Sequence, residues 1–272
     1  MRIKVIVYVI IAIFIGIVIK TGLNNQLTVK NYTIESKELT NQIDMVFISD
    51  LHRNQYGDNQ SELLDTIKQQ DPDIIILGGD LFGNNALEDD PTYELLEGLT
   101  RDYPNKVYYV TGNHEYYRGD IEELKQIVRE HHIQVLEGDT LPITINDTTI
   151  YLSGVNDLGS IPKGELEHVN NQTNTNHFNV LVSHRPEYHD DYYAAGYDVT
   201  LSGHAHGGQI RIPLILNGLY APGQGWFPKY AGGYYRTNQQ HHIIGRGLQR
   251  DGLPIPRLYN PPELVVVHLQ PN

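Results

Sequence analysis

A short apolar run that ends in glycines and a carboxylate constrains the fold of this chain most. Residues 74–77 read Ile-Ile-Ile-Leu without polar alternation, which favours a strand buried on both faces. Gly78 and Gly79 end the run, and Asp80 follows. Ligands of open α/β sheets bind at the carboxyl ends of such strands. A Gly-Gly-Asp tripeptide alone is more often only a turn, so its repetition along the chain decides the interpretation.

The same arrangement recurs after the strands that we predict at 45–48, 106–110, 178–182 and 198–201. Each is followed by side chains that can bind a metal: Asp50 and His52, then Asn113 with His114 and Glu115, then His184, then His204 and His206. Carboxylate, amide and imidazole donors without sulfur suit divalent metal ions. Asp50 and His52 point to one side if the backbone between them stays extended.

Helices are predicted between these strands. The spacing of apolar residues predicts helices over 59–70, 89–101 and 119–132. The order strand, helix, strand is the parallel crossover unit of α/β proteins.

The second half of the chain is patterned differently. Residues 141–145 and 149–153 flank Asn146-Asp147-Thr148 and predict an antiparallel hairpin. This period-two pattern suggests a change from the parallel style of the first half. Residues 156–176 predict a loop with one short helix, and 241–245 and 264–269 predict closing strands.

The N-terminal residues predict a membrane anchor. Val5–Ile19 is unbroken apolar sequence between Lys4 and Lys20. A span needs about 20 residues, and the aliphatic stems of the flanking lysines extend this run. A cleaved signal peptide is the alternative, but residues 20–25 lack the small residues of a cleavage site.

The domain boundaries follow from this anchor. We assign residues 1–22 to the anchor, 23–42 to a polar tether that leads into an edge strand, and 43–272 to the catalytic domain. Arg2 and Lys4 precede the anchor, which predicts an internal N-terminus. The protein is therefore expected to cross the cell membrane once, with an extracytoplasmic domain.

Composition excludes several functions. A formal net charge of −13 argues against nucleic acid as a partner. Phosphate substrates remain possible, because bound divalent metals can reverse the local field. The chain has no cysteine, which excludes thiolate zinc sites, disulfides and a cysteine nucleophile.

Taken in order, the blocks resemble the signature of the calcineurin-like metallophosphoesterases. That signature reads D-x-H, G-D-x-x-[D/G], G-N-H-[D/E], H and G-H-x-H. The matching segments are Asp50–His52, Gly79–Gly83, Gly112–Glu115, His184 and Gly203–His206. The resemblance implies an α/β fold, a four-layer sandwich with two central mixed β-sheets flanked by helices. Gly83 stands where some members have a carboxylate, which removes one supporting group.

The resemblance also implies two divalent metal ions, for which manganese, iron and zinc are all compatible. The first would be held by Asp50, His52 and His206, the second by Asn113, His184 and His204, and Asp80 would bridge both. Two such ions about 3.5–4 Å apart clamp the attacking and leaving oxygens of a phosphoryl displacement.

The implied reaction assigns roles to further residues. A metal-bridging hydroxide would attack phosphorus, and His114, beside the second site, would protonate the leaving oxygen. Asn113 would also contact a phosphate oxygen, and Glu115 would support the site. For Arg53, a contact to substrate phosphate and a surface salt bridge both remain open. For Gln224–Phe227, a substrate groove and an ordinary packed loop remain open.

The layout looks like a membrane-anchored bacterial branch of the superfamily. The resemblance depends on Ser49–His52, Ser183–Pro186, Gly203–Gln209, Arg246–Leu248 and Pro262–Leu264. Some relatives in that branch hydrolyse the pyrophosphate of UDP-2,3-diacylglucosamine. We therefore expect a hydrolase of a phosphodiester or pyrophosphate bond, in a lipid-linked or cell-envelope substrate.

Two alternatives remain. A nucleotide or phosphoprotein monoester phosphatase could use the same metal centre. A non-enzymatic, membrane-tethered binding protein would be marked by missing ligands, and none of the signature ligands is missing.

Overall fold

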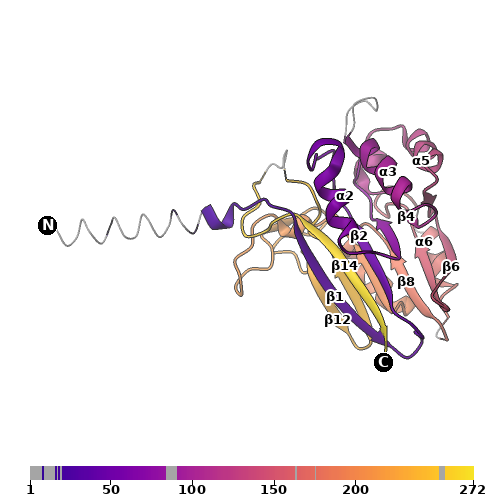
Figure 1. Ribbon diagram of the computed structural model, residues 1–272. Helices are drawn as coiled ribbons and strands as arrows, with labels where there is room; N and C mark the ends of the chain where they lie inside the picture. Colours follow the sequence, from indigo (N-terminus) through magenta and orange to yellow (C-terminus); the bar gives the residue numbers. More distant parts are fainter. Residues whose placement is uncertain are drawn as a thin grey trace.

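The computed structural model describes residues 8, 16, 18, 20–83, 91–162, 164–174, 176–250 and 255–272. Two six-stranded sheets form its centre (Figure 1). The first sheet has the order β1-β14-β2-β3-β4-β5. Its strands are β1 (Thr28–Ser36), β14 (Glu263–Pro271), β2 (Ile43–Ile48), β3 (Ile74–Leu77), β4 (Val107–Tyr109) and β5 (Gln134–Val135).

The second sheet has the order β12-β13-β9-β8-β7-β6. Its strands are β12 (Gly233–Thr237), β13 (Gln240–Ile244), β9 (Val199–Ser202), β8 (Phe178–Val182), β7 (Thr148–Gly154) and β6 (Asp139–Ile145). Both sheets are mixed: four neighbouring strands of each run parallel, namely β2 to β5 in the first and β13, β9, β8 and β7 in the second. The predicted hairpin at 141–153 is confirmed as the antiparallel pair β6–β7.

The strands after this antiparallel hairpin, β8 and β9, return to parallel pairing. β7, β8 and β9 are parallel neighbours, because helices α6 (Gly164–Asn170) and α7 (His189–Ala195) provide the crossovers between them. The period-two pattern of residues 141–153 therefore predicts the pairing of the hairpin at the edge of the sheet, and not the pairing of the strands that follow.

The apolar strand β3 explains how the layers pack. Ile74 and Ile76 belong to the core between the two sheets, where they join residues of the second sheet such as Val180 and Leu201. Ile75 and Leu77 face the opposite way and pack beneath the helices. A strand covered on both faces needs apolar residues at every position.

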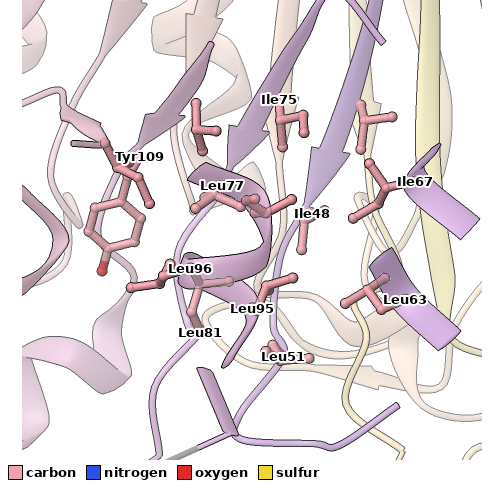
Figure 2. Close-up of a cluster of buried hydrophobic side chains, with 14 of the residues drawn as sticks. Ile48, Leu51, Leu63, Ile67, Ile75, Leu77, Leu81, Leu95, Leu96 and Tyr109 are labelled. Carbon is pink, nitrogen blue, oxygen red and sulfur yellow. The ribbon is translucent and has the colours of Figure 1, made fainter. Parts of the chain in front are cut away.

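Helices cover the outer faces of the sheets. α2 (Ser61–Lys68), α3 (Pro91–Asp102) and α5 (Ile121–Glu130) share a core with the first sheet. Figure 2 shows Leu63 and Ile67 of α2 and Leu95 and Leu96 of α3 against the strands. On the second sheet, α6 and α7 pack over β8 through a separate cluster.

The helix predicted from residue 59 begins at Ser61 instead. Residues Asp58–Gln60 form a 3-10 turn in which Asn59 and Gln60 adopt left-handed backbone angles. The buried Gln60 side chain accepts a hydrogen bond from the Tyr56 amide at 3.0 Å and donates one to the Asn54 carbonyl at 3.0 Å. These contacts replace the first turn of the helix.

The N-terminal expectations fall partly outside the described residues. Most of the predicted anchor, residues 1–22, lies outside them. Among the described residues, no helix has both the length and the apolar character needed to cross a membrane. Within the segment predicted as a tether, residues 28–36 form β1, the edge strand that pairs in parallel with β14. The chain is thus part of the sheet from Thr28 onward.

Candidate metal centre

Strand ends from both sheets meet at the predicted site. In the first sheet, β2 leads to Asp50 and His52, β3 to Asp80, and β4 to α4 (Asn113–Tyr117). In the second sheet, β8 leads to His184, and β9 leads to His204 and His206. Because parallel strands end at the same edge, five connections deliver their side chains to one place.

The first group of side chains consists of Asp50, His52 and His206. One donor atom from each lies within 4.8 Å of the others. The His206 Nε2 atom is 3.8 Å from Asp50 Oδ1. This geometry suits three ligands of one ion.

The second group consists of Asp80, His184 and His204, whose donor atoms also lie within 4.8 Å of one another. His184 Nε2 is 3.1 Å from Asp80 Oδ2, and the same carboxylate oxygen is 3.6 Å from His52 Nε2. Asp80 therefore lies between the two groups.

Four buried polar atoms of the predicted ligands have no hydrogen-bond partner among the described residues: His52 Nε2, His184 Nε2, His206 Nδ1 and Asn113 Oδ1. Buried polar atoms are normally paired. The opposite nitrogen of His184, Nδ1, donates to the Gly78 carbonyl at 2.7 Å, which aims Nε2 at Asp80. Unpaired donor atoms directed at two buried carboxylates fit the coordination of divalent ions.

The pKa values of these side chains are also those expected of metal ligands. Burial lowers the pKa of His52 to about 4 and holds the pKa values of His204 and His206 well below their usual range. These imidazoles are therefore neutral, which is the form that binds metals. Burial also raises the pKa of Asp50 to about 6. A buried carboxylate needs a compensating positive charge.

His184 responds to the same carboxylates in the opposite direction. Burial acts to lower the pKa of His184, but the Asp80 carboxylate beside it raises that pKa to about 10. The position between Asp50 and Asp80 thus attracts positive charge, whether a proton or a metal ion supplies it.

The backbone is strained at the site. Asp50, His52, Asp80, His204 and His206 all adopt positive φ angles between 46° and 65°. This region is uncommon for residues other than glycine, and clusters of such residues mark sites held in place by the surrounding fold.

Glycines make room for the carboxylates. A Cβ at Gly112 would collide with Asp80 Oδ1, and one at Gly203 would come within 2.6 Å of Asp50 Oδ2. The glycines of the sequence blocks are therefore required for close packing around the two carboxylates.

Glu115 supports the site rather than facing it. Its fully buried carboxylate accepts hydrogen bonds from the amides of Gly112 and Asp80 at 2.8 and 2.9 Å, and from Leu81 at 2.8 Å. These contacts join the loop after β3 to the start of α4. The Asp80 carboxylate in turn accepts a hydrogen bond from the His114 amide at 2.8 Å.

The structure places the His114 ring against His52, with ring centroids 4.4 Å apart. His114 also forms a cluster with His52 and Asp80. The ring thus lies near His52 of the first group and near Asp80 of the second, and the role of His114 beside the second ion stays a prediction.

Arg53 lies at the edge of the site, with a left-handed backbone (φ 62°). Its side chain passes over Gly83, where any Cβ would collide with Arg53 Cδ. A larger residue at position 83 would therefore need the Arg53 side chain to move.

The sequence left open whether Arg185 contacts substrate phosphate or forms a surface salt bridge, and it did not reveal the acidic partners that hold Arg185 beside His204. The Arg185 guanidinium donates two hydrogen bonds to buried Asp157, at 2.5 and 3.1 Å. Its Nη1 atom lies 3.3 Å from Glu187 Oε1 and 3.3 Å from His204 Nε2. No local pattern links Asp157 to Arg185, because only the fold brings them together.

Comparison with known proteins supports a metal-binding function for these side chains. The model of the calcineurin-like phosphoesterase family matches residues 43–208, more than half of the chain. The chain belongs to this family. It is a metal-dependent phosphoesterase.

Individual relatives are distant. An uncharacterized metallophosphoesterase of Campylobacter jejuni is 27% identical over 265 residues, which cover 93% of this chain and 66% of that protein. This chain thus spans just under two thirds of that relative's length. The uncharacterized Bacillus subtilis protein YpbG is 28% identical over 255 residues, which cover 92% of this chain and 89% of that protein. A solved Thermus thermophilus protein, 9% identical, matches with a TM-score of 0.50 over 78% of this chain and 92% of that one, a likeness in fold alone.

Proposed function

We propose that the protein hydrolyses a phosphodiester or pyrophosphate bond with two divalent metal ions, in a lipid-linked or cell-envelope substrate. The observation that carries the proposal is that the group of Asp50, His52 and His206 and the group of Asp80, His184 and His204 meet at the Asp80 carboxylate. Asp50, His52 and His206 would hold one ion, and Asn113, His184 and His204 the other, with Asp80 shared. When bound, such ions activate water and stabilise charge on the phosphoryl oxygens.

The protein's own residues have the following roles in this proposal. His114 donates a proton to the leaving oxygen, since its ring lies beside the ligand groups. Arg185 is held at His204 by Asp157, and its guanidinium suits a phosphate oxygen. Glu115 holds Asp80 next to Gly112, the residue before Asn113, because its carboxylate accepts hydrogen bonds from both amides.

The lipid-linked substrate follows from the N-terminal sequence. Val5–Ile19 is apolar and flanked by lysines, and we propose that it anchors the domain on the extracytoplasmic side of the cell membrane. An anchored domain meets substrates that are confined to the same membrane. If the protein were released from membranes by alkaline carbonate washing, this part of the proposal would be abandoned.

Hydrolysis is tested with the full chain in detergent, stripped of metal and resupplied with Mn²⁺. Release of nitrophenol from bis-p-nitrophenyl phosphate and from the monoester is compared, with Asp80→Ala as the control. Metal-dependent turnover of the diester that Asp80→Ala abolishes would support the proposal. Turnover of the monoester alone would show a phosphatase instead, and two bound metals without any turnover would point to a binding protein.

A further inference from the structure

Exposed aliphatic and large aromatic side chains gather in one segment of the chain. Among the described residues, every exposed large hydrophobic side chain other than tyrosine is either Leu23 or lies between residues 212 and 227. The members of the second set, here called the apolar loop surface, are Ile212, Leu214, Ile215, Trp226 and Phe227. Leu214 and Ile215 are exposed to 108% and 81%. Grouped exposure of this kind marks an interaction surface.

The charge of this region differs from that of the rest of the chain. Residues 199–250 contain neither Asp nor Glu, although the whole chain has 33 of them. The same segment carries Arg211, Lys229 and three further arginines. A positive, apolar segment on a protein of net charge −13 suits an anionic partner with an apolar interior.

The apolar loop surface adjoins the N-terminal apolar segment. The Tyr259 hydroxyl donates to the Val18 carbonyl at 2.7 Å, and the Tyr259 amide donates to the Gly22 carbonyl at 2.6 Å. Tyr259 also lines a cavity of about 430 Å³ together with Arg211 and residues 212–217. In Figure 1, the orange loops between β9 and β12 lie at the end of the molecule where the N-terminal segment enters.

The loops are also tied to the metal centre. The 3-10 turn η4 (His206–Gly208) leads from the ligand His206 directly into them. Asn260 Nδ2 donates to the carbonyls of His206 and Gln209, at 2.7 and 3.2 Å. The start of these loops is therefore held by hydrogen bonds directly after the candidate ligand His206.

We propose that the apolar loop surface inserts into the interface of an anionic lipid bilayer. Leu214, Ile215, Trp226 and Phe227 would enter the boundary between headgroups and acyl chains, a usual place for tryptophan and phenylalanine. Arg211 and Lys229 would lie at the level of the lipid phosphates. The membrane is preferred over a second copy of the chain, because residues 199–250 hold no acidic residue that could pair with the cations of a copy, and because the N-terminal apolar run reaches Tyr259 beside these loops through Val18.

The consequence is a second membrane contact that holds the metal centre at the bilayer surface. This last step rests on the proposed function, since it gives a lipid-linked phosphoester access to the site. The insertion itself does not, and it is tested without any measurement of activity.

Trp226 is the only tryptophan of the chain, so it reports on this surface without mutation. The full chain is reconstituted into vesicles of phosphatidylcholine and phosphatidylglycerol, with or without bromine on the acyl chains near the headgroups. Insertion by about 5–10 Å should lower Trp226 fluorescence about twofold or more in the brominated vesicles. Unchanged fluorescence there, together with quenching by aqueous iodide, would overturn the proposal.

A paired variant provides the control. Leu214→Asp with Ile215→Asp should abolish the bromine-dependent quenching, whereas Asn171→Asp with Gln172→Glu adds the same charge at exposed positions outside the surface and should leave it intact. Circular dichroism in detergent checks that both variants are folded. Protection of Trp226 from both quenchers, increasing with protein concentration, would show that a second chain covers the surface and would also overturn the proposal.

Discussion

The metal centre ends at His206, and the loops that carry the apolar loop surface follow directly in the chain. Polar residues usually lie outside a protein and apolar residues inside, and each of the two regions breaks one half of this rule. The centre buries charged carboxylates and leaves buried nitrogen and oxygen atoms unpaired. The loop surface exposes leucine, isoleucine, phenylalanine and tryptophan. Buried unpaired polar atoms and exposed apolar clusters both cost stability unless a ligand or partner meets them. The comparison suggests two partners, a cation for the first region and a membrane for the second.

The largest effect is expected from Asp80→Ala. Removal of the carboxylate that lies between both groups should lower diester turnover about a thousandfold or more, since two-metal catalysis needs both ions in place. Bound metal, measured by mass spectrometry, should fall below one ion per chain. Quenching of Trp226 by brominated lipid should not change, which separates the two regions. Retention of two ions by the variant would contradict the shared role of Asp80.

His114→Ala should lower turnover about a hundredfold while leaving metal content unchanged, because a general acid contributes to the reaction without holding the ions. The loss should be greater for a diester with a phenol leaving group than for one with nitrophenol, which departs without protonation. An equal loss for both leaving groups would remove His114 from this role.

Gly112→Ala tests the close packing at the centre. The added methyl group would collide with the Asp80 carboxylate, and we expect the free energy of unfolding to fall by about 1–3 kcal/mol. Gly164→Ala is the matched control, since a Cβ there meets nothing within 4 Å. Denaturant unfolding of the two variants makes the comparison, and equal stabilities would refute it.

The pH dependence of stability can be predicted from His242, a buried residue of the segment 199–250 that contains neither Asp nor Glu. Its ring packs against His189 and bonds to Ser202 Oγ at 2.9 Å, and burial lowers the pKa of His242 to about 3. In the unfolded chain, the imidazole of His242 takes up a proton as the pH falls below its ordinary pKa near 6.5. In the folded protein, the same imidazole stays neutral until the pH approaches 3. Stability should therefore be lost as pH falls from about 6.5 towards 3, by up to about 1.4 kcal/mol per pH unit from this group.

The measurement for His242 is the difference in unfolding free energy between the wild type and His242→Asn at pH 6.5 and pH 5. The variant should lose less stability than the wild type over this interval. His168→Gln, which changes an exposed histidine, should follow the wild type.

The smallest effect is expected from Leu214→Asn. A fully exposed side chain contributes little to folding, so the free energy of unfolding in detergent should change by less than about 0.5 kcal/mol. Leu201→Ala, at a fully buried position of β9, should cost about 2–5 kcal/mol. A large loss for Leu214→Asn would mean that the loop is part of the fold rather than a surface for a partner.

The positions of the candidate ligands in the fold could be predicted because each follows a strand whose apolar run is visible in the sequence. Asp80 follows the apolar run Ile74–Leu77, and His184 follows the apolar run Phe178–Val182. Since parallel strands deliver their carboxyl ends to one edge, local patterns were sufficient to assemble the candidate site.

Other features could not be predicted, because they depend on contacts between distant residues. The Asp157–Arg185 pair and the Asn260 contacts to the His206 loop exist only in the folded chain. The left-handed backbone of Asp50 and Asp80 is imposed by surrounding packing and has no local signal in these residue types. The place of β1 depends in the same way on its partner β14.

The pairing of β1 with β14 has a consequence for synthesis. The register extends from Thr28 beside Glu263 to Ser36 beside Pro271, and β14 also separates β1 from β2. During translation, β1 emerges early but has no neighbour until nearly all of the catalytic domain has been made. Closing so long a loop is slow. A chain that lacks β14 would therefore leave β1 without a partner and the edge of β2 open, and open edges favour pairing with other chains.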